Sequence, residues 1–138
     1  MEKITWLPSY EVGIAVIDRQ HQKIISVINK LIDGGTAITV DSEVLSQLLS
    51  ELTAYASEHF STEEDFFVAC GYSGASGHIQ EHKRYRLKIA SLCQDVMCHE
   101  ENAPVELLKF LSTWWVEHIL KEDLDFKKCA RMQNKACR

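Results

Sequence analysis

The stretch that decides how this chain is interpreted is His78-Ile79-Gln80-Glu81-His82. Two histidines four residues apart lie on one face of an α-helix, where both imidazoles can bind the same metal ion or other ligand. Taken alone, such a pair is more often a solvated feature of a helix surface than a metal site. The His-Glu-x-x-His box of zinc proteases is excluded, because Ile79 stands where its general-base glutamate would have to be. Whether the pair binds a metal therefore depends on the candidate ligands elsewhere in the chain.

Length and composition indicate one globular domain. The chain has 138 residues, of which 46% are hydrophobic and 25% are charged, with a formal net charge of −5. An acidic body disfavours a nucleic-acid partner. No apolar run approaches the roughly 20 residues that span a bilayer, and the first residues lack a secretory signal. We expect a cytoplasmic domain over residues 1–138 without a membrane partner, with an ordered arm (1–17) and a short basic tail (127–138).

The five cysteines are odd in number and contain no Cys-x-x-Cys, so neither a disulfide framework nor a zinc ribbon is indicated. Reduced thiols suit the expected compartment. Cys70 and Cys93 lie on or near helix faces and are predicted to be small core residues. Cys98, Cys129 and Cys137 are expected to be more exposed.

Apolar residues recur at helical spacing in four segments. The first is predicted to begin at Asp18 as N-cap and to end at Gly34-Gly35, and the second to run from Asp41-Ser42 to Cys70. The third follows the turn-forming stretch 71–77, and the fourth begins near Pro104 and runs toward Asp123. Because β-type alternation is absent, the sequence predicts an all-α, antiparallel up-down-up-down four-helix bundle.

Each predicted helix carries potential metal ligands on its apolar face. The set comprises His21, His59, Glu63, His78, His82 and His118, with Asp123 just beyond the last histidine. As core residues without partners, seven such groups would cost about 1–3 kcal/mol each, comparable with the about 5–15 kcal/mol of total stability. A bound metal removes this conflict. Five imidazoles and two carboxylates are too many donors for one tetrahedral zinc, and they suit two six-coordinate ions of iron or manganese.

The spacing of the last two candidates is irregular. Five residues turn an ideal helix by about 500°, which leaves the His118 and Asp123 side chains about 140° apart. Asp123 can join His118 only through a bulge or loosening, which we expect near Lys121. Asp18, three residues before His21, is expected either to cap the helix or to hydrogen-bond a metal-binding residue from the side away from the metal.

With these residues assembled, the chain resembles the hemerythrin family, specifically its bacterial single-domain members. The motifs are Asp18-x-x-His21-Gln22, His59-x-x-x-Glu63-Glu64, His78-x-x-x-His82 and Trp114-x-x-x-His118-Ile119-x-x-x-Asp123. The resemblance implies two non-haem iron ions with an oxo or hydroxo bridge. The resemblance further implies that one iron is held by His78, His82 and His118 and the other by His21 and His59, with Glu63 and Asp123 bridging the two irons. The iron with two histidines keeps an open position for dioxygen.

The resemblance also places a ligand pocket beside the open iron, lined by Ile24, Phe60, Trp114, Trp115 and Ile119. Trp115 departs from the leucine that is common in the family, and its ring either narrows the pocket or faces the bundle exterior or an oligomer contact. The implied function is reversible dioxygen binding as a carrier, store or sensor, without catalysis. The alternative is a di-iron enzyme with peroxidase or O2- or NO-reducing activity. Whether the chain binds a protein partner or self-associates is not decided by the sequence.

Overall fold

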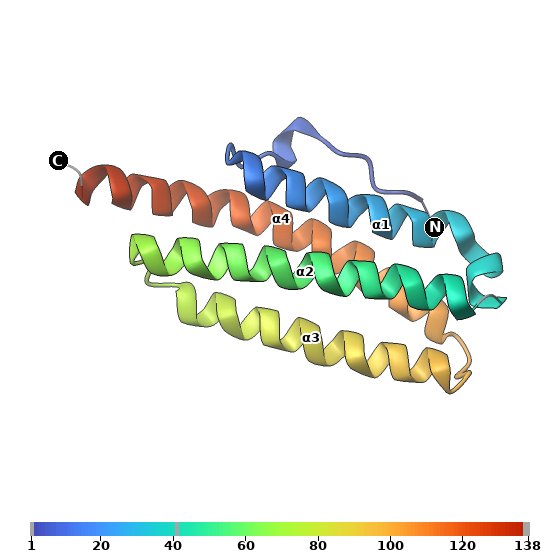
Figure 1. Cartoon of the computed structure of the whole chain (residues 1–138). Helices are drawn as coiled ribbons and strands as arrows, with labels where there is room; N and C mark the ends of the chain where they lie inside the picture. Colours follow the sequence, from blue (N-terminus) through green and yellow to red (C-terminus); the bar gives the residue numbers. More distant parts are fainter. Residues whose placement is uncertain (1, 41, 137–138) are drawn as a thin grey trace.

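Four long helices, each antiparallel to the one before it, form the protein (Figure 1). The computed structural model describes the backbone of residues 2–40 and 42–136, and its side-chain description leaves out residues 35–40, 42, 123, 130 and 132–136. The elements are a short 3-10 helix η1 (Pro8–Tyr10), α1 (Ala15–Val40), α2 (Ser42–Cys70), α3 (Ala75–Met97) and α4 (Ala103–Ala136). The predicted all-α four-helix bundle is confirmed, and all regular structure within these described residues is helical.

The ends of α2 and α3 show why the chain turns where it does. Gly71 has a φ of +68°, its N–H donates to the carbonyl of Val68, and the N–H of Tyr72 donates to the carbonyl of Phe67. This Schellman arrangement satisfies the last carbonyls of α2, and the ring of Tyr72 packs 4.8 Å from that of Phe67. His99, with a φ of +57°, ends α3 by the same pattern. His99 itself is exposed and lies outside the apolar faces of the helices.

The start and end of the first helix differ from expectation. The helix begins at Ala15, so Asp18 is not its N-cap. The Asp18 carboxylate instead accepts the backbone N–H groups of Val12 and Gly13, at 2.8 and 3.3 Å, and ties the arm to α1. The predicted end at Gly34-Gly35 was also wrong, since α1 continues to Val40. Glycine costs a helix only about 1 kcal/mol per residue relative to alanine, which neighbouring helical residues can outweigh.

The N-terminal arm is ordered along α1. The side-chain amide of Asn29 accepts the N–H of Ile4 and donates to its carbonyl, at 2.8 and 2.9 Å. This pair of bonds holds the extended part of the arm against the bundle (Figure 1).

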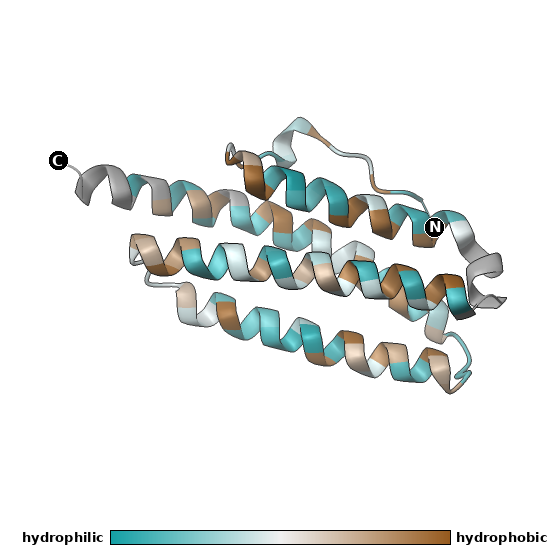
Figure 2. Cartoon of the chain, viewed as in Figure 1, coloured by the Kyte–Doolittle hydropathy of each residue, from teal (hydrophilic) through white to brown (hydrophobic). Residues whose placement is uncertain are grey.

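Two apolar clusters fill the bundle. Along each helix, hydrophobic and hydrophilic residues alternate at helical spacing (Figure 2), which is the pattern of amphipathic helices packed face to face. The larger cluster, here called the apolar half, contains Ile28, Leu52, Leu107, Leu111 and Trp115 among its fully buried residues. The smaller cluster, at the other end, contains Ile17, Phe67, Phe126 and Cys129.

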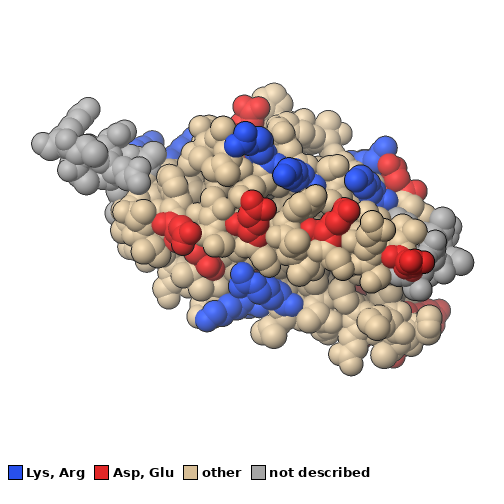
Figure 3. Space-filling view, viewed as in Figure 1, with Lys and Arg blue, Asp and Glu red and all other residues tan. Residues whose placement is uncertain are grey.

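The outer surface is charged in a mixed way. On the face seen in Figure 3, acidic and basic side chains are interspersed. No helix in the described residues has a stretch apolar and long enough to cross a membrane.

Candidate metal centre

Between the two apolar clusters lies a layer of buried histidines and glutamates, here called the ligand layer. Its members come from all four helices: His21, His59, Glu63, His78, His82, His118 and Glu122, each at most 4% exposed. They form two groups whose ligand atoms lie within 4.8 Å of one another. One group contains His21, His59, His118 and Glu122, and the other contains Glu63, His78, His82 and His118. His118 belongs to both, so the two groups are adjacent.

Glu63 lies between the two groups. One carboxylate oxygen is 2.6 Å from Nε2 of His78, and the other is 3.0 Å from Nε2 of His59 and 3.1 Å from Nε2 of His118. The same side chain therefore contacts histidines of both groups, as a bridging carboxylate would.

A second carboxylate, which the sequence analysis did not name, comes from α4. Glu122 approaches Nε2 of His21 at 2.5 Å and Nε2 of His59 at 3.1 Å, and it also contacts His118. Its position four residues after His118 repeats the spacing of His59 and Glu63, and that signal could have found it. The irregularity expected near Lys121 was wrong, since α4 is one α-helix from Ala103 to Ala136. The side chain of Asp123 lies outside the described residues.

Three further polar residues contact the outer sides of the histidines. The side-chain oxygen of Gln20 accepts from Nδ1 of His59 at 2.9 Å, and Glu64 lies 3.1 Å from Nδ1 of His82. Asp125 lies 3.4 Å from Nδ1 of His78. The hydrogen bonds of Gln20 and Glu64 fix the orientation of the His59 and His82 rings and leave the opposite nitrogen, Nε2, facing the centre of the layer.

Burial and proximity set opposite protonation states for the two carboxylates. Burial and the neighbouring charge of Glu63 raise the pKa of Glu122 well above its usual range. Burial also opposes ionisation of Glu63, but His118 and the hydrogen bonds of Glu122, His118 and His59 hold its pKa well below normal. Without metal, the pair therefore shares one proton, as closely spaced buried carboxylates do.

Burial holds two of the histidines, His118 and His21, in the neutral form. Burial lowers the pKa of His118 to about 4, and burial together with His59 and His118 lowers the pKa of His21. For His78, burial opposes protonation, but the hydrogen bond to Glu63 outweighs it and raises the pKa. Neutral imidazoles are the form that binds metal ions.

Several buried nitrogen and oxygen atoms of the ligand layer make no hydrogen bond, and they indicate whether the layer fits a metal. Buried atoms that make no hydrogen bond include Nε2 of His82 and Oε2 of Glu122, although this oxygen lies 2.5 Å from Nε2 of His21. In addition, Nε2 of His21 and Nε2 of His59 lie 3.0 Å apart. Because Nδ1 of His59 donates to Gln20, Nε2 of His59 presents its lone pair toward His21. Buried acceptors that face one another in this way are stabilised by cations, so the donor set fits two adjacent metal ions.

Aromatic rings form one wall of the layer. Phe60 stacks on His82 with ring centroids 3.9 Å apart, and Trp114 stacks on His118 at 4.5 Å. Trp115 lies 5.9 Å from His59 and stacks on Phe60. The remaining predicted pocket residues, Ile24 and Ile119, are fully buried.

Trp115 points into the bundle. Its side chain is fully buried and its indole N–H donates to the Tyr85 hydroxyl at 3.0 Å, so the interpretation of an exterior ring is wrong. This bond was not predictable from spacing, which indicates only that Tyr85 lies on the apolar face of its helix. Burial raises the pKa of Tyr85, which keeps the hydroxyl protonated.

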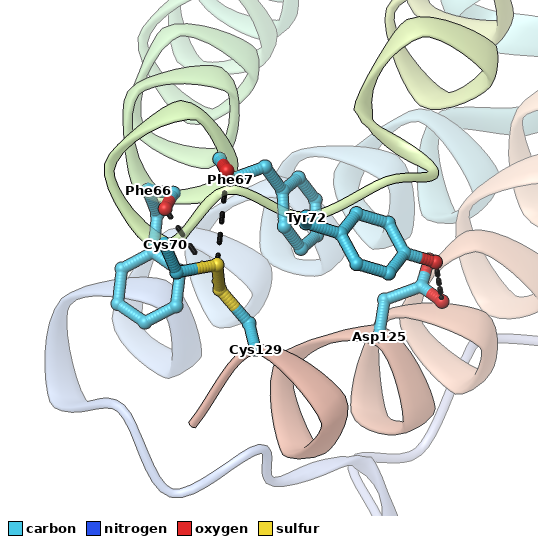
Figure 4. The surroundings of a disulfide bond; sticks show 6 residues. All are labelled: Phe66, Phe67, Cys70, Tyr72, Asp125 and Cys129. Carbon is cyan, nitrogen blue, oxygen red and sulfur yellow. Dashed lines mark hydrogen bonds between the residues drawn. A yellow bond between two sulfur atoms is a disulfide. The ribbon is translucent and has the colours of Figure 1, made fainter. Parts of the chain in front are cut away.

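A disulfide closes the bundle on the side of the smaller cluster. Cys70 at the end of α2 is bonded to Cys129 of α4, while Cys93 and Cys98 are free (Figure 4). The expectation of reduced thiols was therefore wrong for this pair, and so was the expected exposure of Cys129, which is fully buried. Beside the disulfide, the Tyr72 hydroxyl donates to Asp125 at 2.9 Å (Figure 4). Cys137 lies outside the described residues.

Four antiparallel helices that enclose two adjacent His/Glu groups define a helical-bundle protein with buried metal-binding clusters. Comparison with known proteins agrees: the family model of the hemerythrin HHE cation-binding domain matches residues 12–130. The chain belongs to this family.

Curated relatives cover nearly the whole chain. A bacteriohemerythrin of Clostridium acetobutylicum is 30% identical over 125 residues, which are 88% of this chain and 96% of that protein. A bacteriohemerythrin of Methylococcus capsulatus is 30% identical over 134 residues, 94% and 98% of the two chains. A hemerythrin-like protein of Naegleria gruberi is 26% identical over 122 residues, 88% and 89% of the two chains.

Proposed function

We propose that the protein binds dioxygen reversibly at a non-haem di-iron centre in the ligand layer. The observation that carries this proposal is that two adjacent buried His/Glu groups share His118, whose one inward nitrogen can bind only one of two ions. With His78, His82 and His118 on one ion and His21 and His59 on the other, the second ion has one protein ligand fewer. A vacant coordination position is what a small diatomic ligand needs. When bound, iron in such a centre supplies the reversible electron transfer that holds dioxygen.

The bridging carboxylates in this proposal are Glu63 and one residue of the Glu122–Asp123 pair. Glu63 is supported by its contacts to histidines of both groups. The regular course of α4 favours Glu122, which follows His118 by one helical turn, while the motif spacing of the family favours Asp123.

The wall of the layer supports binding over turnover. Phe60, Trp115, Ile24 and Ile119 are fully buried and keep water away from the two-histidine side. The Tyr85 hydroxyl accepts the Trp115 bond, and its raised pKa makes it a poor general acid. A dry surrounding without a ready proton donor slows the irreversible loss of bound oxygen. We infer that the protein is not an enzyme and that it acts in the cytoplasm as a carrier, store or sensor.

Spectroscopy of the iron-loaded protein tests the proposal. The protein is loaded with ferrous iron without oxygen, and visible charge-transfer absorption is followed while oxygen is admitted, removed and readmitted. We expect a band that appears and disappears over repeated cycles, and the same behaviour in the His99→Ala control, whose histidine is exposed. Absence of a reversible band contradicts the proposal. Sustained consumption of oxygen or peroxide with a reductant, faster than autoxidation, would instead identify a di-iron enzyme.

A further inference from the structure

We propose that metal ions enter and leave the ligand layer through the seam between α3 and α4, and that the Lys121–Glu81 ion pair controls this passage. The inference rests on the proposed metal centre and adds a route to it. Lys121 comes from α4 and Glu81 from α3, and their side chains are 49% and 32% exposed. The pair therefore lies across the seam at the protein surface.

Two hollows of the surface meet at this ion pair. One, of about 280 Å³, reaches His118, and the other, of about 450 Å³, reaches His78. Both are lined by Glu81, Arg84 and Lys121. The two histidines belong to the three-histidine group, so the seam is where the ligand layer comes closest to these hollows.

The histidines present unpartnered atoms on this side. Nδ1 of His78 and Nδ1 of His118 are buried without a hydrogen-bond partner, and the two side chains are each 2% exposed. The Asp125 carboxylate lines the second hollow, 3.4 Å from Nδ1 of His78. A cation that enters there meets Glu81 first and Asp125 next, and both offer the oxygen ligands that divalent ions accept.

The other hollows lead elsewhere. Three further hollows, of about 340, 390 and 750 Å³, lie along other pairs of elements. One lies between the N-terminal arm and α1, one between α1 and α2, and one between α2 and α3, and none of the three is lined by a histidine of the ligand layer. The hollow between α1 and α2 reaches only Gln20, which hydrogen-bonds the outer nitrogen of His59. Among the hollows described, the route to a ligand histidine therefore runs along α3 and α4.

Charge explains how the ion pair would control the passage. The Lys121 ammonium repels an incoming divalent cation, and while it is bound to Glu81 it also occupies the carboxylate that would receive that cation. Movement of Lys121 away from the seam exposes Glu81. Lys121 therefore slows the movement of metal in both directions, whereas Glu81 assists entry.

The test measures rates of ferrous-ion uptake, and of release to an excess of chelator, under anaerobic conditions. Lys121→Gln is expected to speed both by about tenfold, because it removes one unit of charge from the path of a divalent ion. Glu81→Gln is expected to slow uptake. The matched control is Lys23→Gln, which removes an exposed lysine at the α1–α2 hollow and should leave both rates unchanged. Metal content at equilibrium and the melting temperature should be the same in all four proteins.

Equal rates in the wild type and Lys121→Gln would overturn the inference, as would faster exchange in Lys23→Gln alone. Faster uptake in Glu81→Gln would overturn the role given to Glu81. These failures are distinct from failure of the proposed metal centre, in which the wild type itself would bind no iron at equilibrium, and the route would fall with it.

Discussion

The apolar half and the ligand layer are built on the same four helices, yet they are stabilised differently. In the apolar half, residues such as Leu111 and Ile28 are fully buried against other hydrocarbon, and burial alone is favourable. The ligand layer instead buries five histidines and two glutamates. For His118 and Glu122, burial disfavours the charged form, and several atoms of the layer have no hydrogen-bond partner. The apolar half therefore supports the fold by itself, whereas the ligand layer would be stabilised by bound cations.

The largest expected effect is the loss of the whole metal pair, which should follow when the ligand layer is broken at the residue shared by both groups. His118→Ala should bind no stable pair of metal ions and should lose the stabilisation that metal gives the wild type, about 2.7 kcal/mol at a free metal concentration 100 times the Kd. Leu111→Ala, in the apolar half, should lose about 2–5 kcal/mol but keep its metal. Metal analysis and thermal melts with and without metal check both. A His118→Ala protein with full metal content would contradict the assignment.

Substitution of the α4 carboxylates sharpens the same comparison. In matched Glu122→Gln and Asp123→Asn variants, one substitution should lower the metal content below two ions per chain, because a bridging ligand is lost, while the other should leave it unchanged. Loss in Glu122→Gln supports the ligand that the regular helix favours, and loss in Asp123→Asn supports the one that the motif spacing favours. Full metal content in both variants would contradict an α4 bridging carboxylate.

Reduction of the disulfide tests the end of the bundle beyond the ligand layer. Cys70 and Cys129 are 59 residues apart in sequence, and in the chain-entropy account a cross-link of that length contributes about 4 kcal/mol. A reducing agent should lower the melting temperature of the wild type by about 12 °C, and Cys70→Ser should already show the lower value. The matched control is Cys93→Ser, which removes a free thiol and should respond to reduction as the wild type does. A wild type unaffected by reduction would show that the bond contributes nothing to stability.

In net size the smallest effect is a pH dependence of the metal-free protein, because its contributions have opposite signs and partly cancel. The pKa of His118 is about 4 in the folded chain and about 6.5 in the unfolded chain, so between these values the unfolded state binds the extra proton. The free energy of unfolding should therefore fall as pH falls from about 6.5 to about 4, with His118 contributing about 3 kcal/mol at most. His21, whose pKa is also lowered, acts in the same direction, whereas the raised pKa values of His78 and Glu122 act in the opposite one.

Denaturant titrations of the metal-free protein across this pH range check the slope. His118→Gln is the comparison, because it removes the titrating imidazole and should flatten the part of the slope that His118 causes. Identical slopes in the two proteins would contradict the lowered pKa of His118.

Much of this arrangement was predictable from the sequence because it depends on periodicity. The spacings His59–Glu63 and His78–His82 place both partners on one helix face, and the apolar stripes through His21 and His118 place those histidines in the core. The end of α2 at Cys70 followed from Gly71, which adopts the left-handed conformation that ends a helix.

The rest depends on contacts between residues far apart in sequence. The Cys70–Cys129 bond joins two helices, and no local cysteine spacing such as Cys-x-x-Cys predicts it. The bond from Trp115 to Tyr85 likewise depends on how α3 and α4 pack. Asp18 fits an N-cap by residue type, but tertiary contacts with the arm begin the helix three residues earlier, at Ala15.

The central claim is that the ligand layer is a site for two metal ions. Native mass spectrometry of the protein, loaded anaerobically with ferrous iron and freed of excess metal, tests it most directly. We expect a main species with two irons per chain in the wild type and in His99→Ala, and a loss of this species in His118→Ala. A wild type that carries one iron or none, or a His118→Ala protein that still carries two, would contradict it.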